Sequence, residues 1–235
     1  MNQTRVMCAA LAAAMCLTVA VRAQNGARMG GHANVLTAQE QKEGWTLLFD
    51  GRSLEKWDVT PALAKVFKVG EGSIKVDLSD AGGTLLTKDT FDNFILKVEF
   101  KAHPDINSGI ILRAAPPRPR PAPGEKPAPI PGGPGYELQI RDKNPGNYTG
   151  GEFLTGSIVD VVKAPHDAKI LPNQWNTLEA TVTGDHFVVV FNGKKVADGH
   201  DAKRASGHIG LQLAHPEDAR DTPIEFRNIK IRRLP

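Results

Sequence analysis

Residues Gly135 to Asp142 read GYELQIRD, and polarity alternates along the whole stretch. Successive side chains of a β-strand point to opposite faces of the sheet. One face of this strand is therefore apolar, with Tyr136, Leu138 and Ile140. The other face is polar, with Glu137, Gln139 and Arg141. The pattern predicts a strand whose apolar face packs into a core and whose polar face points outward.

Two further stretches have the same organisation, Asn107 to Ala114 (NSGIILRA) and Gly207 to Ala214 (GHIGLQLA). Their outward positions are Asn107, Gly109, Ile111 and Arg113 in the first stretch and His208, Gly210 and Gln212 in the second. A sheet surface with glycines in its floor and polar groups projecting from it suits a polar ligand of the size of a sugar. We take this surface as the candidate site. For Arg113 and Glu137, on adjacent strands, the residues alone favour a structural ion pair.

Short strands separated by turns are predicted along the rest of the chain, with no long helical pattern. They lie at 45–50, 54–57, 73–79, 84–88, 94–101, 107–114, 135–142, 156–162, 176–183, 187–191, 195–197, 209–213 and 224–231. The segment 54–57 is predicted to return after a turn at Asp50-Gly51 as the partner of 45–50. Strands at this spacing predict one all-β domain, built as a two-sheet antiparallel sandwich.

Three local signals refine this prediction. Thr37 and Glu40 have the spacing of a capping box, which predicts a short helix that holds the N-terminus against the sheet. Asn192-Gly193 predicts a tight hairpin, because both residues tolerate positive φ. The apolar residues of the last strand change parity along its length, which predicts a β-bulge near Arg227-Asn228.

The N-terminal residues predict export. Arg5 precedes an apolar run from Val6 to Val21, and Val21-Arg22-Ala23 offers a cleavage site with small residues at its ends. We therefore expect a secretory signal peptide at 1–23, a flexible leader at 24–35 and a single domain at 36–235, in the periplasm or outside the cell. No membrane span is expected after cleavage; the alternative is an uncleaved anchor.

Charge and cysteine content exclude several classes of function for the mature chain. Both cysteines, Cys8 and Cys16, lie in the predicted signal peptide, so disulfides, thiolate metal sites and a cysteine nucleophile are excluded. Without Arg5 and Arg22, the 29 basic residues become 27 against 26 acidic residues, a net charge of +1. Such a balance gives no electrostatic case for nucleic-acid binding.

One segment departs from the rhythm of strands. Pro116 to Pro134 (PPRPRPAPGEKPAPIPGGP) consists mostly of proline, glycine and alanine, so it cannot pair in a sheet. We expect an extended, polyproline-like surface loop whose removal spares the fold. It joins the strand of Arg113 to the strand of Glu137. The composition by itself favours a disordered insertion without a role, and the functional alternative is a rim or lid over the polar face.

Seven motifs taken together resemble the 3-keto-disaccharide hydrolase domain family. They are LTxxExxxGWxxLFDGxxLxxW (36–57), NSGIxxR (107–113), GYExQIxD (135–142), WNxxE (175–179), FNGxxV (191–196), GxIGLQ (207–212) and FRNIxI (226–231). Each motif is weak by itself, but their common order along nearly the whole mature chain is specific. The resemblance implies a concanavalin A-like jelly roll that is secreted or periplasmic.

The resemblance also implies a substrate and a set of site residues. The substrate is a glycoside or disaccharide already oxidised at sugar carbon 3, which makes a sugar 3-oxidoreductase the expected functional partner. The family's polar positions map to Arg113, Glu137, Gln139, Asp142 and Gln212. Two departures weaken this transfer of chemistry. Members often have a tyrosine where this chain reads GSIV at 156–159, and the segment after the GLQ motif is longer here.

The chemistry that a 3-keto sugar undergoes assigns roles to these residues. The ketone acidifies the hydrogen at carbon 2, so the glycosidic bond leaves by elimination and water then adds to the enone. Glu137 is the candidate base, Arg113 the enolate stabiliser and His208 a second acid or base. We expect Gln139, Gln212, Asn107 and Asp142 to bind substrate; these four complete the candidate set.

Alternatives to this chemistry stay open at the level of sequence. A non-catalytic carbohydrate-binding module needs only the polar face, although all three tryptophans fall in motif positions that look structural. A retaining glycosidase needs two carboxylates close together on one strand face, whereas the same-face neighbours of Glu137 are Gln139 and Arg141. No cofactor is indicated with certainty, and a divalent metal held by oxygen ligands such as Glu137 and Asp142 is the remaining option.

Overall fold

This computed structural model describes residues 33–77, 83–118, 125–126, 128–143, 153–213 and 224–235. The predicted signal peptide and its cleavage site lie outside the described residues, as do parts of the proline-rich segment and the insertion at 216–223. Among the described residues, no helix has the length and apolar character needed to cross a membrane.

A short helix opens the described chain. Helix α1 (Ala38–Lys42) begins with the predicted capping box: Thr37 Oγ1 accepts from the Glu40 amide at 3.1 Å, and the Glu40 carboxylate accepts from the Thr37 amide at 2.9 Å. The Glu40 carboxylate also pairs with Lys230 on the last strand. That ion pair holds the helix against a sheet, so both parts of the prediction are confirmed.

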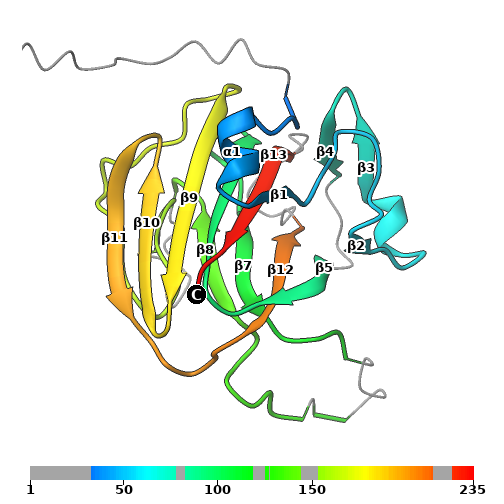
Figure 1. The fold of residues 1–235 in the computed structure, drawn as a ribbon. Helices are drawn as coiled ribbons and strands as arrows, with labels where there is room; N and C mark the ends of the chain where they lie inside the picture. Colours follow the sequence, from blue (N-terminus) through cyan, green and yellow to red (C-terminus); the bar gives the residue numbers. More distant parts are fainter. Residues whose placement is uncertain (1–32, 78–82, 119–124, 127, 144–152, 214–223) are drawn as a thin grey trace, which may run out of the picture. The chain divides into compact units, whose positions relative to one another are not determined.

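Thirteen strands in the described residues form two antiparallel sheets (Figure 1). Sheet A runs in the order β11 (Lys194–His200), β10 (His186–Phe191), β9 (Trp175–Thr183), β6 (Phe94–Lys101), β13 (Ile224–Arg233), β4 (Ser73–Val76) and β3 (Phe67–Gly70), with β1 (Trp45–Leu47) also paired to β13. Sheet B runs in the order β2 (Trp57–Asp58), β5 (Thr84–Phe91), β12 (Gly207–Gln212), β7 (Ser108–Ala114) and β8 (Tyr136–Ile140). The other helical element is a 3₁₀ turn, η1 (Leu63–Lys65).

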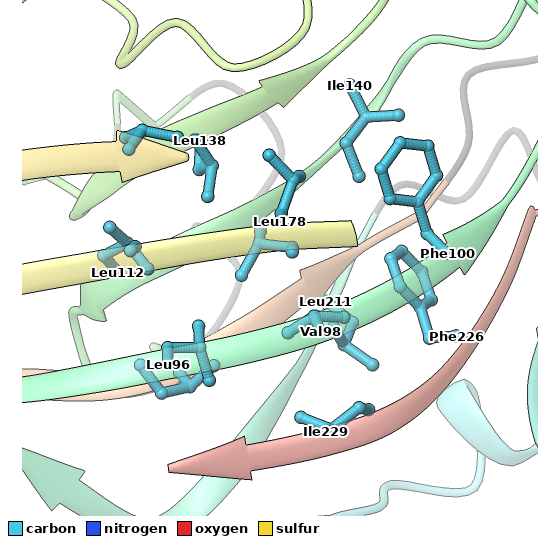
Figure 2. Close-up of a cluster of buried hydrophobic side chains, with 14 of the residues drawn as sticks. Leu96, Val98, Phe100, Leu112, Leu138, Ile140, Leu178, Leu211, Phe226 and Ile229 are labelled. Atoms are coloured by element: carbon cyan, nitrogen blue, oxygen red, sulfur yellow. The ribbon is translucent and has the colours of Figure 1, made fainter. Parts of the chain in front are cut away.

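The core lies between the two sheets and contains the apolar side chains that the alternation predicts. Figure 2 shows labelled members pointing toward one another: Leu96, Val98, Phe100, Leu178, Phe226 and Ile229 from sheet A, with Leu112, Leu138, Ile140 and Leu211 from sheet B. Leu138 and Ile140 are 0% exposed. Burial of one such side chain contributes about 1.5–3 kcal/mol, so Leu138→Ala is expected to cost about 2–5 kcal/mol. The predicted fold class, an all-β two-sheet jelly-roll sandwich, is confirmed.

Two predicted backbone features are confirmed by their dihedral angles and register. Asn192 and Gly193 have φ of 47° and 81° in the turn between β10 and β11. Asn228 has φ of 48°, and the pairing of β13 with β6 shifts between Arg227 and Lys230. The bulge lets both halves of β13 present apolar side chains to the same core.

The predicted hairpin between 45–50 and 54–57 is wrong. Strand β1 pairs with β13 in sheet A, whereas β2 pairs with β5 in sheet B. The Asp50 carboxylate accepts hydrogen bonds from the Arg52 and Ser53 amides, both at 2.8 Å. This local bonding favours a loop over a two-residue hairpin turn, and the loop carries the chain from one sheet to the other.

Two further strand predictions need correction. The segment 156–162 is a turn with isolated bridges rather than a strand: Ile158 bridges Leu138 and also Val162. Positive φ at Gly156 (87°) and Asp160 (61°) prevents a continuous extended conformation there. Strand β3 was not predicted, because only Phe67 of its four residues is buried and the apolar alternation is weak.

Candidate active site

A recess of about 280 Å³ lies on the outer face of sheet B. This volume is near the lower end of the range for small-molecule sites and suits one sugar ring. Nine described residues line it: Thr84, Leu86, Ile111, Ala114, Ala115, Pro134, Gly135, Glu137 and Gln212. Glu137 is the one ionisable residue among them, so the recess combines a single carboxylate with a few polar groups and an otherwise apolar wall.

Two glycines form the floor on which the polar side chains lie. A Cβ at Gly109 would be 3.1 Å from both Cγ and Oε1 of Glu137, which places that carboxylate directly over the glycine. A Cβ at Gly210 would be 2.5 Å from Thr84 Cγ2 and 3.2 Å from Ile111 Cβ. A side chain at Gly210 would therefore displace Thr84, and one at Gly109 would require the Glu137 carboxylate to move by a few tenths of an ångström.

Glu137 is held in an environment that favours its protonated form. It lies in β8 directly opposite Ile111 of β7 rather than opposite a cation. Burial raises the pKa of Glu137 above its ordinary value of 4.5, and the nearby carboxylate of Asp160 adds to the shift. A hydrogen bond from the Gln212 side chain and the positive charge of Arg141 oppose this shift only in part.

Gln212 completes the polar part of the recess. The ionised carboxylate only accepts hydrogen bonds, so the bond from Gln212 that lowers the pKa of Glu137 has Gln212 Nε2 as its donor. Gln212 Oε1 is buried and has no hydrogen-bond partner among the described residues. Glu137 and Gln212 thus line the same recess, as the prediction of one shared polar surface expects.

Arg113 does not lie on this surface, and its predicted placement beside Glu137 is wrong. His208 pairs with Ala114 and Gly210 pairs with Ile111, so β7 carries one extra residue at this point. Arg113 has φ of 50° in the resulting bulge, and its side chain is 1% exposed. A bulge changes the face to which the following side chain points, which is why the alternation of β7 fails at Arg113.

The guanidinium of Arg113 is committed to main-chain carbonyls. It donates to the Asp92 oxygen at 2.9 and 2.6 Å, to Gly184 at 2.8 Å and to Arg204 at 2.9 Å. Its Cζ also lies 5.6 Å from the ring centroid of Phe187 in sheet A. These contacts tie together three connections between strands, so neither a role as enolate stabiliser nor an ion pair with Glu137 is supported.

Asp142 likewise has a structural environment. Its Oδ1 accepts from Thr155 Oγ1 at 2.9 Å, and its Oδ2 accepts from the Ile170 amide at 2.7 Å. Both oxygens are thus engaged by the protein, which argues against the predicted substrate contact and against a metal shared with Glu137. Burial raises the pKa of Asp142, although these two hydrogen bonds and Lys169 oppose the shift.

The remaining predicted residues, Gln139, His208 and Asn107, do not line the recess. Gln139 is buried, faces Gly109 across the strands, and accepts from the Ile140 amide at 3.0 Å. His208 is half-buried on β12, and its Nδ1 lies 2.7 Å from the Thr87 carbonyl oxygen, which requires a hydrogen on Nδ1. Asn107 is half-buried and directly precedes β7.

The end of the proline-rich segment forms part of the rim, as its rim interpretation expects. Pro134 and Gly135 line the recess, and the Ala115 amide donates to the Pro134 carbonyl at 2.9 Å. Arg204 Nη2 donates to the carbonyls of Pro131 at 2.6 Å and Gly133 at 2.8 Å. This guanidinium fixes the approach of the segment to the recess.

Sequence reasoning missed two charged residues that act on the site. The charge of Arg141 lowers and the charge of Asp160 raises the pKa of Glu137. Arg141 shares the outward parity of Glu137, so the alternation of β8 was the available signal for it. Asp160 comes close because the Val159 amide donates to the Glu137 carbonyl at 2.9 Å, a pairing across the turn that no local pattern indicates.

No set of three or more histidine, cysteine, aspartate or glutamate side chains is arranged to hold a metal ion within the described residues.

Comparison with known families gives one match that spans most of the chain. The model of the 3-keto-alpha-glucoside-1,2-lyase-like domain family matches residues 44–232. The match begins directly before β1 and ends at residue 232, so it contains both sheets except for the last residue of β13. No protein of curated function matches the sequence.

Solved structures share the architecture. A "putative glycosyl hydrolase" from Parabacteroides distasonis ATCC 8503 is 26% identical with a TM-score of 0.61, covering 81% of this chain and 99% of that chain. A second one from the same organism is 21% identical with a TM-score of 0.66, covering 87% and 100%. A Bacillus subtilis protein with a galectin-like fold is 11% identical with a TM-score of 0.51, covering 86% and 94%.

Proposed function

The chain belongs to the 3-keto-alpha-glucoside-1,2-lyase-like domain family, and on this premise we propose that it cleaves glycosides whose sugar already carries a ketone at carbon 3. Carbohydrate-active function is supported by the family and by the 26% identical structure named as a glycosyl hydrolase. The finer assignment rests on one observation: a half-buried carboxylate with a raised pKa, that of Glu137, lines a recess of the size of a sugar ring.

In the proposed reaction Glu137 takes the hydrogen from carbon 2 of the keto sugar. The electrons of that C–H bond form the double bond between carbons 1 and 2, while the bond from carbon 1 to the glycosidic oxygen breaks. The departing oxygen takes up a proton. Addition of water across the new double bond then gives the free 3-keto sugar.

The environment of Glu137 suits a general base. A base is most effective when its pKa approaches the working pH, and burial raises the pKa of Glu137 in that direction. The hydrogen bond from Gln212 favours the ionised form and so limits the rise in the pKa of Glu137. Arg141 contributes a positive charge that acts on this site and favours an anionic, enolate-like transition state, the part that sequence reasoning had given to Arg113.

His208 is the second acid/base candidate. Because its Nδ1 carries the hydrogen that bonds to the Thr87 carbonyl, a neutral ring has its basic lone pair on Nε2. It shares β12 with Gln212, so it is the residue to examine if Glu137 is not the base.

A non-catalytic carbohydrate-binding module is the competing function. Sugar-binding modules commonly present an aromatic side chain to a sugar ring, and none of the nine residues that line the recess is aromatic. Trp45 and Trp57 are buried, and the ring of Trp175 is covered by Arg227, whose Cζ lies 3.9 Å from the ring centroid. The raised pKa of Glu137 has a use in catalysis but none in simple binding, so we favour the enzyme.

Incubation of the purified protein with an aryl 3-keto-glucoside and with its unoxidised parent tests this proposal. Cleavage of the keto compound alone, with exchange of the carbon-2 hydrogen in deuterated solvent, is expected. Cleavage of both compounds would indicate an ordinary glycosidase. Binding of either compound without cleavage would indicate a binding module.

We also propose that the protein acts outside the cytoplasm, on the evidence of the N-terminal pattern around Arg5 and Ala23. N-terminal sequencing of the exported protein should then begin at Gln24. The substrate must come from an enzyme that oxidises carbon 3 of a sugar, which makes a sugar 3-oxidoreductase the functional partner.

A further inference from the structure

The lining of the recess is divided into a polar part and an apolar part. At the polar end, Thr84 of β5 lies directly opposite Gln212 of β12, and both residues are half-buried. The Glu137 carboxylate leans toward this end, because its Cγ and Oε1 lie over Gly109, which is at the same end of β7. The three polar side chains that line the recess are thus gathered on one side of it.

Apolar side chains fill the other part of the lining. Ile111 of β7 is half-buried, and it lies directly opposite both Gly210 of β12 and Glu137 of β8. Leu86 and Ile111 approach each other over Gly210, where a Cβ would be 3.0 Å from Leu86 Cδ2 and 3.2 Å from Ile111 Cβ. On its other side, Ile111 Cγ2 is 2.7 Å from the Cβ position of Gly135. The two glycines therefore leave room for Ile111 at the centre of an apolar surface.

This surface continues to the rim of the recess. The Ala115 amide donates to the Pro134 carbonyl at 2.9 Å, which closes the rim, and Pro134 is exposed, so the surface reaches the solvent. We call the apolar side chains of the lining the apolar wall: Leu86, Ile111, Ala114, Ala115 and Pro134. These side chains form no hydrogen bonds, so a hydroxyl placed against them loses its water without gaining a side-chain partner.

Glu137 lies at the boundary between the two parts. Side chains directly opposite each other have Cβ atoms about 4.5–5.5 Å apart, so the apolar wall begins at Ile111, within one side-chain length of the carboxylate. In the proposed reaction the carboxylate meets carbon 2, and the neighbouring carbon 1 carries the leaving group. Because the recess takes about one ring, it holds the atoms on either side of the glycosidic bond. The sugar hydroxyls find their partners at the polar end, which leaves the apolar wall to the leaving group.

We propose that the apolar wall is a subsite for an apolar leaving group, so that the protein selects keto glycosides of apolar alcohols over keto disaccharides. This inference rests on the proposed function, because it takes Glu137 as the base that acts at carbon 2. A second sugar brings several hydroxyls to the wall, whereas a hydrocarbon ring gains affinity from burial there. Ile111, at the centre of the wall, is then a specificity-determining residue.

Ligands that bind but cannot be cleaved test this subsite by itself. Three 3-keto-glucose derivatives, substituted at carbon 1 through a carbon–carbon bond, have no glycosidic oxygen to leave. They carry a methyl group, a cyclohexylmethyl group or a second glucose on a methylene. Calorimetric titration should show the cyclohexylmethyl ligand binding about tenfold more tightly than the methyl ligand, the gain expected from burial of about 55 Å² of apolar surface. The glucosyl ligand should bind no more tightly than the methyl ligand.

Two matched variants locate the contact. Ile111→Thr keeps a β-branched side chain at a half-buried outer position but places a hydroxyl in the apolar wall. The preference for the cyclohexylmethyl ligand should fall to about threefold or less in this variant. Val188→Thr makes the same kind of change at a half-buried outer position of β10 in sheet A, and it should keep the full preference.

Each outcome decides one question. Equal affinity for the methyl and cyclohexylmethyl ligands, tighter binding of the glucosyl ligand than of the cyclohexylmethyl ligand, or an unchanged preference in Ile111→Thr would overturn the subsite even if 3-keto-glucosides are cleaved. Failure of all three ligands to bind would overturn it as well. A preference that falls in Ile111→Thr and persists in Val188→Thr supports it. If an aryl 3-keto-glucoside is then not cleaved, the proposed reaction fails while the apolar subsite stands.

Discussion

Both sheets carry glutamates on their outer faces, but the residues opposite these glutamates differ between the sheets. On sheet A three glutamates are each paired with a cation directly across the strands: Glu179 with Lys97 at 2.9 Å, Glu225 with Lys101 at 2.7 Å and Glu99 with Arg227 at 2.7 Å. On sheet B the glutamate of the recess stands opposite Ile111 and over a glycine. A strand alternation by itself does not distinguish these two situations.

The difference appears in the pKa values. Burial would raise the pKa of Glu225, but hydrogen bonds from Lys101 and Ser73 lower it below the ordinary value. For Glu137, burial raises the pKa, and the hydrogen bond from the neutral amide of Gln212 and the charge of Arg141 oppose this shift only in part. A carboxylate with a cation across the sheet is thus stabilised as an anion, whereas a carboxylate without one is ready to take a proton.

Replacement of the unpaired carboxylate should have the largest effect. Glu137→Gln keeps the shape of the side chain but removes the base, so kcat for an aryl 3-keto-glucoside should fall by roughly 10²–10⁴. The matched substitution on the other face, Glu179→Gln, should leave kcat unchanged and alter stability by less than about 1 kcal/mol. Exchange of the carbon-2 hydrogen in deuterated solvent reports the same step without cleavage. If Glu137→Gln exchanges this hydrogen as fast as the parent protein, the base is elsewhere and His208 is the next residue to replace.

Replacement of Arg113 provides the second test. Its guanidinium bonds to main-chain carbonyls, so it differs both from the ion pairs of sheet A and from the carboxylate in the recess of sheet B. Arg113→Lys keeps one charge but loses the planar group that reaches the carbonyls of Asp92, Gly184 and Arg204. We expect a loss of about 3 kcal/mol in the free energy of unfolding, measured by urea denaturation. The kcat of the remaining folded protein should stay within about twofold of the parent, since the recess is lined by other residues. A large fall in kcat with unchanged stability would return Arg113 to the site.

Most of the fold could be predicted from the sequence, because the buried apolar residues recur at every second position of the strands. The alternation of β8 and the turn at Asn192-Gly193 depend on neighbouring residues, and both are present as predicted. The bulge of β13 was predictable because apolar residues continue beyond it: Phe226 and Ile229 are both buried although they differ in parity. A change of register inside a strand can be detected where apolar residues flank it on both sides.

The same reasoning explains the failure at Arg113. The bulge of β7 comes after Leu112, which is the last large apolar residue of the strand. No apolar pattern follows the bulge within the strand, so the sequence gives no sign that the side chains change face there. The hydrogen bonds of Asp142 could not be predicted for another reason: its partners Thr155 and Ile170 are distant in sequence and show no motif with it. Glu137 and Gln212 were predicted because both lie within regular parts of their strands.

The floor of the recess offers a smaller, steric test. Ala at position 109 would place Cβ 3.1 Å from the Glu137 carboxylate and 3.2 Å from the Leu138 carbonyl oxygen, so the carboxylate must move by a few tenths of an ångström. Misplacement of a base on this scale should lower kcat about tenfold in Gly109→Ala. The control is Gly70→Ala on sheet A, where a Cβ would meet only Lys75 at 3.7 Å, an ordinary contact. Equal kcat in the two variants would show that the position of the carboxylate is not limiting.

The smallest expected effect concerns how folding stability depends on pH. Glu137 on sheet B and Asp198 on sheet A should change the stability in opposite directions as pH rises. Since burial raises the pKa of Glu137, the unfolded chain ionises at a lower pH than the folded one. The contribution of Glu137 to stability is therefore complete below pH 4.5 and is lost as pH rises through the folded-state pKa. Glu137→Gln should gain in melting temperature relative to the parent protein as pH rises, while kcat/KM of the parent rises over the same range because the base becomes ionised.

Asp198 on strand β11 of sheet A should show the opposite sign. Hydrogen bonds from Lys195 and His186 lower its pKa to about 2, so its contribution is present above pH 3.8 and lost as pH falls toward 2. Asp198→Asn should therefore be slightly less stable than the parent protein at neutral pH and equal to it near pH 2, because this exposed carboxylate is screened by solvent. Thermal melts of the parent and the two variants across this range compare the sheets directly. Differences of the same sign would mean that Glu137 is paired in solution with a cation, as the glutamates of sheet A are, and a paired carboxylate would be a poor base.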